Sequence, residues 1–108
     1  MSEAKRQFFL DGYVTGMSGR HTVIGRNGDV PIRLGDIFTV VARYHPRRYP
    51  DDYDKRPEVE AKKDVELRVR WLHAYDQELD ELGEGMTGSV ALEGEGAEHL
   101  GPGWVLEA

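Results

Sequence analysis

The chain has 108 residues, enough for one domain with one hydrophobic core, and its formal net charge is −6. It contains no cysteine, which excludes disulfides and thiolate sites and favours a reducing compartment. The N-terminus is polar and no apolar run approaches the ~20 residues that span a bilayer. We therefore expect a cytoplasmic protein without membrane contact, folded as a single domain over residues 1–108.

Charge is distributed unevenly along the sequence. Residues 1–48 contain eight Lys or Arg against four Asp or Glu, whereas residues 49–108 contain six against sixteen. After Arg70 there is no Lys or Arg, although nine acidic residues follow. Because phosphate binding needs clustered cations, the C-terminal part of the chain is a poor surface for nucleic acid.

The first part of the chain predicts three main strands, over residues 7–14, 20–26 and 37–44, where apolar and β-branched residues are concentrated. Gly12 interrupts the first of them and predicts a β-bulge. The sequence Asn27-Gly28-Asp29 predicts a tight turn with positive φ angles.

Residues 45–63 break this pattern. The stretch contains three prolines and almost no aliphatic residue, which predicts a long loop. Residues 64–75 then alternate between apolar and charged side chains, as a strand does when one of its faces is buried. The expected buried face consists of Val65, Leu67, Val69 and Trp71, continued by His73 and Tyr75.

After this strand the sequence predicts a helical turn at residues 76–82, with Asp76 as its N-cap, and further strands at 86–92 and 103–107. Short strands separated by glycine turns are typical of barrels and sandwiches. We therefore predict an all-β fold, a small closed or partly open barrel of about six strands with a long loop at 45–63. The expected core is Phe8, Leu10, Val23, Ile37, Val41, Val65, Leu67, Val69, Trp71, Val90, Leu92 and Val105.

The order of these elements resembles domain 2, the β-barrel, of translation elongation and initiation factor GTPases. Three stretches carry the resemblance: the glycine-flanked strand SGRHTVIGR from Ser18, the turn IRLGD from Ile32, and the glycine-punctuated strands between Leu82 and Leu106. In that family the barrel is not catalytic and contacts aminoacyl-tRNA or the ribosome beside the GTPase domain. The chain has no GxxxxGK[ST] phosphate loop, so the resemblance is to a free-standing barrel without the GTPase domain.

No group of residues in the sequence has the spacing of a catalytic or metal site. The four histidines, His21, His45, His73 and His99, show no metal-ligand spacing, no serine lies in a nucleophile elbow, and the acidic pairs do not form a calcium loop. We therefore expect no metal, no cofactor and no enzymatic activity. One alternative is a small enzyme that uses His73 as an acid or base, with Tyr75 on the same strand face and a carboxylate to orient the imidazole.

The segment RYHPRRY, from Arg43, is the best candidate for recognition because its cations suit phosphates and its aromatic rings suit stacking. Three aspartates at 51, 52 and 54 follow and offset its charge. The candidate binding residues are Arg43, Tyr44, His45, Arg47, Arg48 and Tyr49. We expect a binding module with an unidentified partner and favour a protein partner over RNA. The alternative is an acidic inhibitor or immunity-type protein that covers a basic partner through residues 71–108.

Overall fold

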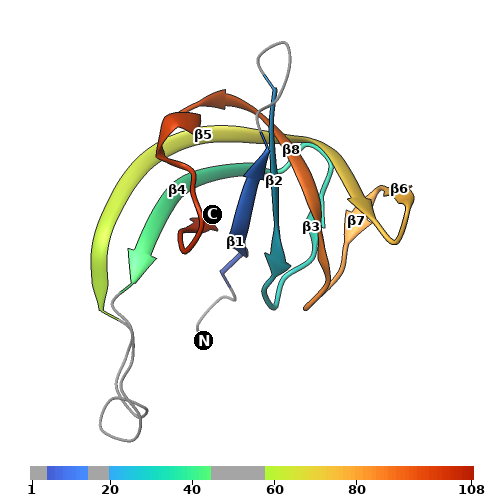
Figure 1. The fold of residues 1–108 in the computed structure, drawn as a ribbon, viewed down its shortest axis with the longest axis horizontal. Helices are drawn as coiled ribbons and strands as arrows, with labels where there is room; N and C mark the ends of the chain where they lie inside the picture. The colour runs from blue at the N-terminus through green and yellow to red at the C-terminus, as the bar shows by residue number, and fades with distance from the viewer. Residues whose placement is uncertain (1–4, 15–19, 45–57) are drawn as a thin grey trace, which may run out of the picture.

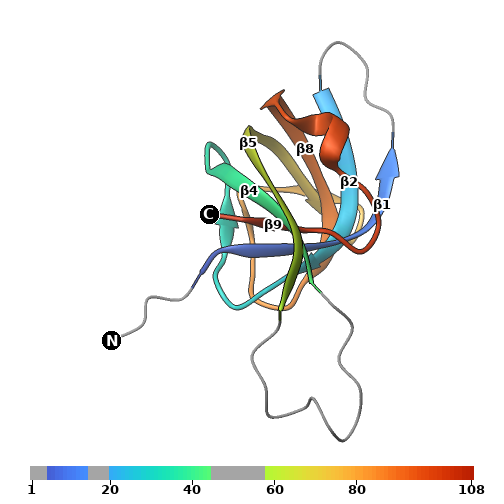
Figure 2. The same cartoon turned by 90° about the vertical axis from the view of Figure 1, so that its left-hand side faces the viewer.

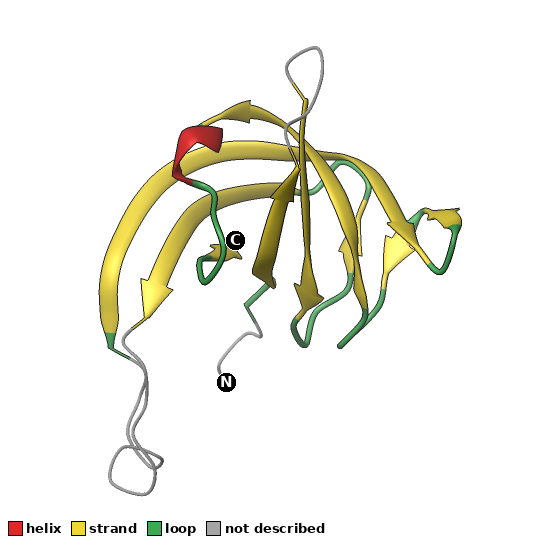
Figure 3. Cartoon of the chain, in the orientation of Figure 1, coloured by secondary structure: helices red, strands yellow, loops and turns green. Residues whose placement is uncertain are grey.

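The computed structural model describes residues 5–14, 20–44 and 58–108. Strands dominate this part of the chain, as Figure 3 shows, and no helix in it has the length and apolar character needed to cross a bilayer. The elements are β1 (Gln7–Val14), β2 (Arg20–Asn27), β3 (Ile32–Arg33), β4 (Ile37–Tyr44), β5 (Val59–Ala74), β6 (Gln77–Leu79), β7 (Glu81–Leu82), β8 (Thr87–Glu95), the 3₁₀ helix η1 (Ala97–His99) and β9 (Val105–Glu107).

Six antiparallel strands form a closed ring in the order β4-β9-β1-β2-β8-β5, with β5 pairing back to β4. Figure 2 shows the short β9 lying between β1 and β4. β6 extends the sheet at β5, and β3 and β7 make a separate two-stranded sheet. The predicted all-β barrel of about six strands is therefore confirmed.

The interior of the ring is filled by the inward side chains of the strands. All of the predicted core residues are buried except Ile37 and Trp71. Phe38, the neighbour of Ile37, is fully buried instead. Each buried side chain of this size stabilises the fold by about 1.5–3 kcal/mol relative to exposure, so the core supplies most of the driving force for closing the ring.

A β-bulge in β5 decides which of its side chains face the interior. The pairing of β5 with β8 skips Arg70, between Val69 and Trp71. An extra residue on one strand reverses the alternation beyond it, so Leu72 is fully buried while Trp71 and His73 lie on the outer face. The expected core position of Trp71 and the buried face continued by His73 are therefore wrong.

The bulge predicted near Gly12 is confirmed, because the pairing of β1 with β2 skips a residue between Leu10 and Gly12. A different glycine allows β8 to approach β5. Gly94 has a φ of 145°, and a Cβ added there would overlap the carbonyl oxygen of Glu66. Any residue other than glycine at position 94 would therefore displace the backbone of β5 at Glu66.

The predicted helical turn at residues 76–82 is replaced by two short strands, β6 and β7. β6 folds back antiparallel on β5, with Leu72 opposite Leu79 and Ala74 opposite Gln77. The two connecting residues, Tyr75 and Asp76, have φ angles of 53° and 60°, as in a two-residue hairpin turn with both residues left-handed. Asp76 is therefore a turn residue, and the helical prediction is wrong because the chain returns at once onto β5.

The predicted loop at 45–63 is too long at its C-terminal end. Residues 59–63 belong to β5, and Val59 pairs with Tyr44 at the far end of β4; residues 45–57 lie outside the described part of the chain. We call the paired extension of residues 41–44 and 59–63 the β4–β5 arm. Figure 1 shows β5 curving from this arm across the molecule to β6.

The side chain of Asn27 connects the two-stranded sheet of β3 and β7 to the barrel through hydrogen bonds to backbone carbonyl groups. Asn27 is 1% exposed, and its side-chain Nδ2 lies 3.0 Å from the carbonyl oxygen of Val30, 2.9 Å from that of Leu82 and 3.0 Å from that of Gly83. Its φ angle is not positive. The expectation of a positive-φ turn at this residue is therefore wrong, because its side chain, and not its backbone, organises the connection.

Candidate functional site

Two of the six candidate binding residues, Arg43 and Tyr44, lie at the end of β4, and the other four are outside the described residues. Arg43 Nε is 3.4 Å from Glu60 Oε2, and the Arg43 side chain is 55% exposed. Lys62 and Lys63 on the facing strand are also exposed. The three cations of the β4–β5 arm are therefore largely exposed to solvent. A surface ion pair such as Arg43–Glu60 contributes little to stability.

Tyr44 is tied to a buried carboxylate. Its hydroxyl donates to Glu107, with the phenol oxygen 2.8 Å from both carboxylate oxygens, and Glu107 is only 3% exposed. Gln7 Nε2 donates to the same carboxylate at 2.7 Å, and Lys5 Nζ lies 3.9 Å away. Burial, the hydrogen bond and the negative charge of Glu107 raise the pKa of Tyr44 to about 12. Tyr44 therefore connects the end of β4 to Glu107 on β9, and through that carboxylate to Gln7 on β1.

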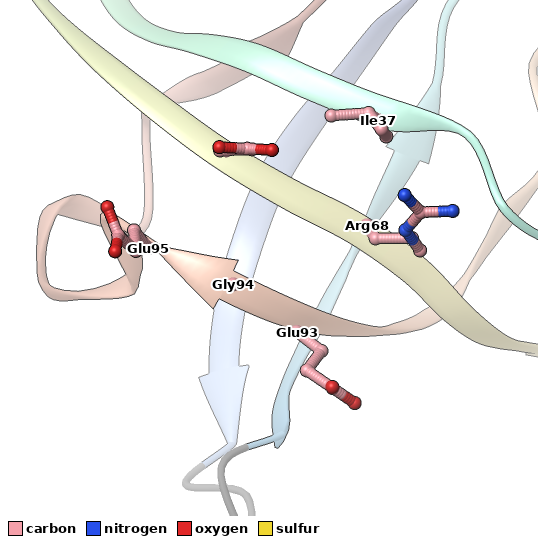
Figure 4. A pocket seen from close by; sticks show the side chains of 6 residues that line it. Ile37, Arg68, Glu93, Gly94 and Glu95 are labelled. Carbon is pink, nitrogen blue, oxygen red and sulfur yellow. The ribbon is translucent and has the colours of Figure 1, made fainter.

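A shallow hollow of about 150 Å³ over β4, β5 and β8 gathers acidic residues (Figure 4). Glu66 is paired with Glu95 across the two strands, and Arg68 with Glu93. Figure 4 shows the Arg68 side chain near Ile37. Among the described residues, no three His, Asp or Glu side chains are placed to hold a metal ion together. The lining of the hollow is Ile37, Glu66, Arg68, Glu93, Gly94 and Glu95.

His73 stacks on Trp71 on the outer face of β5. The two ring centroids are 5.1 Å apart and the rings are within 7° of parallel. Glu78, which pairs with His73 across the strands, accepts a 2.9 Å hydrogen bond from Trp71 Nε1. The acid–base alternative needs a carboxylate that orients the imidazole, and the carboxylate of Glu78 instead accepts from the Trp71 indole.

Sequence reasoning missed this outer group of aromatic side chains. This group forms because of the bulge at Arg70 and the turn at Tyr75-Asp76. The amino-acid composition around Arg70 does not predict a bulge there. The available signal was the tolerance of aspartate for positive φ, but Tyr75 beside it argued against a turn of that kind.

The sequence matches no protein-family model, and no curated protein is similar to it. The solved structures that match the fold include two of translation elongation factor SelB from Methanococcus maripaludis, in the apo form and in complex with the GTP analogue GppNHp. Each matches 99% of this chain with a TM-score of 0.69 and 17% sequence identity. The chain spans 19% of the length of the SelB chain.

An identity of 17% with a TM-score of 0.69 establishes a common fold. Within the described residues, the strands and turns that carried the resemblance in sequence are in place. The Leu34-Gly35-Asp36 turn is closed by a 2.8 Å hydrogen bond from the Arg33 backbone N–H to Asp36 Oδ2. The chain therefore has the β-barrel fold of a translation elongation factor domain, as its sequence led us to expect.

Proposed function

We propose that the chain is a non-enzymatic binding module of the translation-factor type, acting as one cytoplasmic domain over residues 1–108. The observation that supports this proposal is the structural match of 99% of this chain to 19% of a longer elongation factor chain. A barrel of this kind supplies a surface, and its function depends on which residues it presents to a partner.

The contact surface we propose is the β4–β5 arm with the segment that joins its strands. Its candidate residues are Arg43, Tyr44, His45, Arg47, Arg48 and Tyr49. The exposed cations Arg43, Lys62 and Lys63 support this choice. We favour a protein partner over RNA because the net charge of −6 opposes a phosphate backbone.

The test is affinity capture from a lysate of the source cell, comparing the unmodified chain with a charge-reversed arm, Arg43→Glu with Lys62→Glu. The control, Arg26→Glu with Arg68→Glu, makes the same change of charge at exposed residues outside the arm. We expect the arm variant to recover roughly tenfold less partner and the control to recover a normal amount. Equal losses in both would refute the arm as the contact surface.

Nuclease treatment of the lysate distinguishes the classes of partner. A protein partner is retained after the treatment, whereas loss of the captured species would identify RNA and contradict the favoured class. Repeating the capture at two salt concentrations measures how much of the binding is electrostatic, because exposed charges more than ~8 Å apart are largely screened at physiological salt.

A further inference from the structure

The outer face of the β5–β6 hairpin carries two partly buried aromatic rings, Trp71 and His73, beside the exposed Tyr75. Trp71 and His73 stand parallel on β5, Glu78 faces them from β6, and Tyr75 occupies the turn with 79% of its surface exposed. We call these four residues the hairpin face. They lie at the opposite end of β5 from the β4–β5 arm, as Figure 1 shows by the positions of β6 and the start of β5.

The surroundings of the hairpin face are uncharged toward β8 and β2. Cross-strand pairing places Ser89 beside His73 and Ala91 beside Trp71. Ile24, 40% exposed, comes next to Ser89 on β2. These neighbours are small, and both rings keep part of their surface exposed, so a planar group can reach them.

The hairpin turn requires a positive φ at position 75, but it does not favour tyrosine there. The φ of 53° at Tyr75 is one that glycine, asparagine and aspartate adopt more easily than an aromatic residue. The ring gains little from burial because most of its surface is exposed to water. An exposed aromatic residue at a strained position points to a role in contact with another molecule.

The negative charge around the hairpin face favours a positively charged ligand. Asp76, Glu78 and Asp80 are exposed, and no Lys or Arg follows Arg70 in the sequence. Arg70 itself is 3.5 Å from Glu93. Glu78 uses Oε1 to accept from Trp71, which fixes the carboxylate beside the stacked rings and leaves its other oxygen directed to no described partner.

Arginine fits these features better than lysine does. A guanidinium is planar, stacks on aromatic faces and donates hydrogen bonds to a carboxylate in the same plane. The acidic surroundings repel phosphate, so they disfavour nucleic acid here. We propose that the hairpin face binds an arginine-rich segment of a partner protein, with a guanidinium stacked on the Trp71–His73 pair and bonded to Glu78.

The test uses the full chain and a labelled peptide of alternating arginine and glycine, at physiological salt. Fluorescence anisotropy gives the Kd, and the NMR resonance of the Trp71 indole N–H reports contact at the site. We expect this resonance to shift on titration, and the lysine version of the peptide to bind several-fold more weakly. An unchanged indole resonance would overturn the proposal.

Glu78→Gln removes the charge but keeps an oxygen to accept from Trp71, so the rings keep their arrangement. We expect roughly tenfold weaker binding. Glu84→Gln is the matched control, since it removes the same charge from an exposed residue that is outside the hairpin face. Equal weakening by both substitutions would show attraction to net charge only and would also overturn the proposal.

Tyr75→Asn separates binding from folding. Asparagine accepts the positive φ, so this variant should melt at the same temperature as the unmodified chain or higher, while its affinity for the peptide falls. Unchanged affinity would remove Tyr75 from the site. The variant with Arg43→Glu and Lys62→Glu should bind the peptide normally, so the outcome here is independent of the outcome for the β4–β5 arm.

Discussion

Tyr44 is a candidate binding residue by its sequence context, and it also stabilises the barrel through a hydrogen bond to Glu107. Its hydroxyl reaches a carboxylate that is almost fully buried between β1 and β4. A buried carboxylate is stable only when hydrogen bonds or cations compensate for lost water. Tyr44, Gln7 and Lys5 supply this compensation for Glu107.

The raised pKa of Tyr44 predicts a loss of stability at high pH. The folded state favours the neutral phenol, with a pKa of about 12 against an ordinary value of 10.0. The stabilisation is therefore complete below pH 10 and is lost as the pH rises from 10 to 12, because the unfolded chain ionises first. Urea unfolding across this range measures the effect.

Tyr44→Phe is the control for this pH dependence. It should lower the free energy of unfolding at neutral pH by about 1.5 kcal/mol, the contribution of a hydrogen bond to a charged group. It should also show a smaller decline above pH 10, since the four other tyrosines are common to both chains. Identical declines would show that Tyr44 does not cause the loss.

Asn27→Ala should destabilise the protein through a different kind of contact. Its amide faces three backbone carbonyl oxygens in a site that water does not reach. The amide nitrogen has two hydrogens to donate, so at about 1 kcal/mol for each hydrogen bond we expect the free energy of unfolding to fall by about 2 kcal/mol. Asn27→Asp should be worse, because it places a carboxylate against those oxygens. A loss of less than ~1 kcal/mol for Asn27→Ala would contradict this account.

At the scale of the elements, β5 separates what the sequence can predict from what it cannot. Alternation correctly assigns Val65, Leu67 and Val69 to the core because each is related to the next by the two-residue period of a strand. The bulge at Arg70 ends this relation. Its position depends on pairing with β8, about 20 residues further along the chain, and no local pattern encodes that pairing.

The bulge is tested by substituting the two residues that follow it. Leu72→Ala should cost about 3 kcal/mol because it leaves a cavity in the core. Trp71→Ala, on the outer face, should cost about 1 kcal/mol despite the larger change in size. Chemical denaturation of the two variants gives both values. The opposite order would place Trp71 inside and remove the bulge.

The same distinction applies to the candidate site. Its cationic segment is visible in sequence because Arg43 and its neighbours are adjacent in the chain. The hairpin face is not visible, because it combines a bulge, a strained two-residue turn and a residue from the returning strand. The strands themselves were predictable, since their apolar patterns and flanking glycines are local.

At the scale of the whole molecule, β5 separates two surfaces of opposite character. Its first residues form the β4–β5 arm with exposed lysines, and its last residues form the hairpin face with exposed carboxylates. The uneven distribution of charge along the sequence therefore places basic residues at one end of β5 and acidic residues at the other. Because the two surfaces share no side chain, substitutions in them should act independently.

The closure of the ring has a consequence for how the protein is made. In the described part of the chain, the strand that pairs with both β1 and β4 is the three-residue β9, Val105–Glu107. β9 is the last strand in chain order, so the ribosome synthesises it after all the others. Until then, the edges of β1 and β4 that pair with β9 have no partner strand. Exposed edges invite aggregation, and a chaperone that shields β1 or β4 during translation would protect this chain when it is most vulnerable.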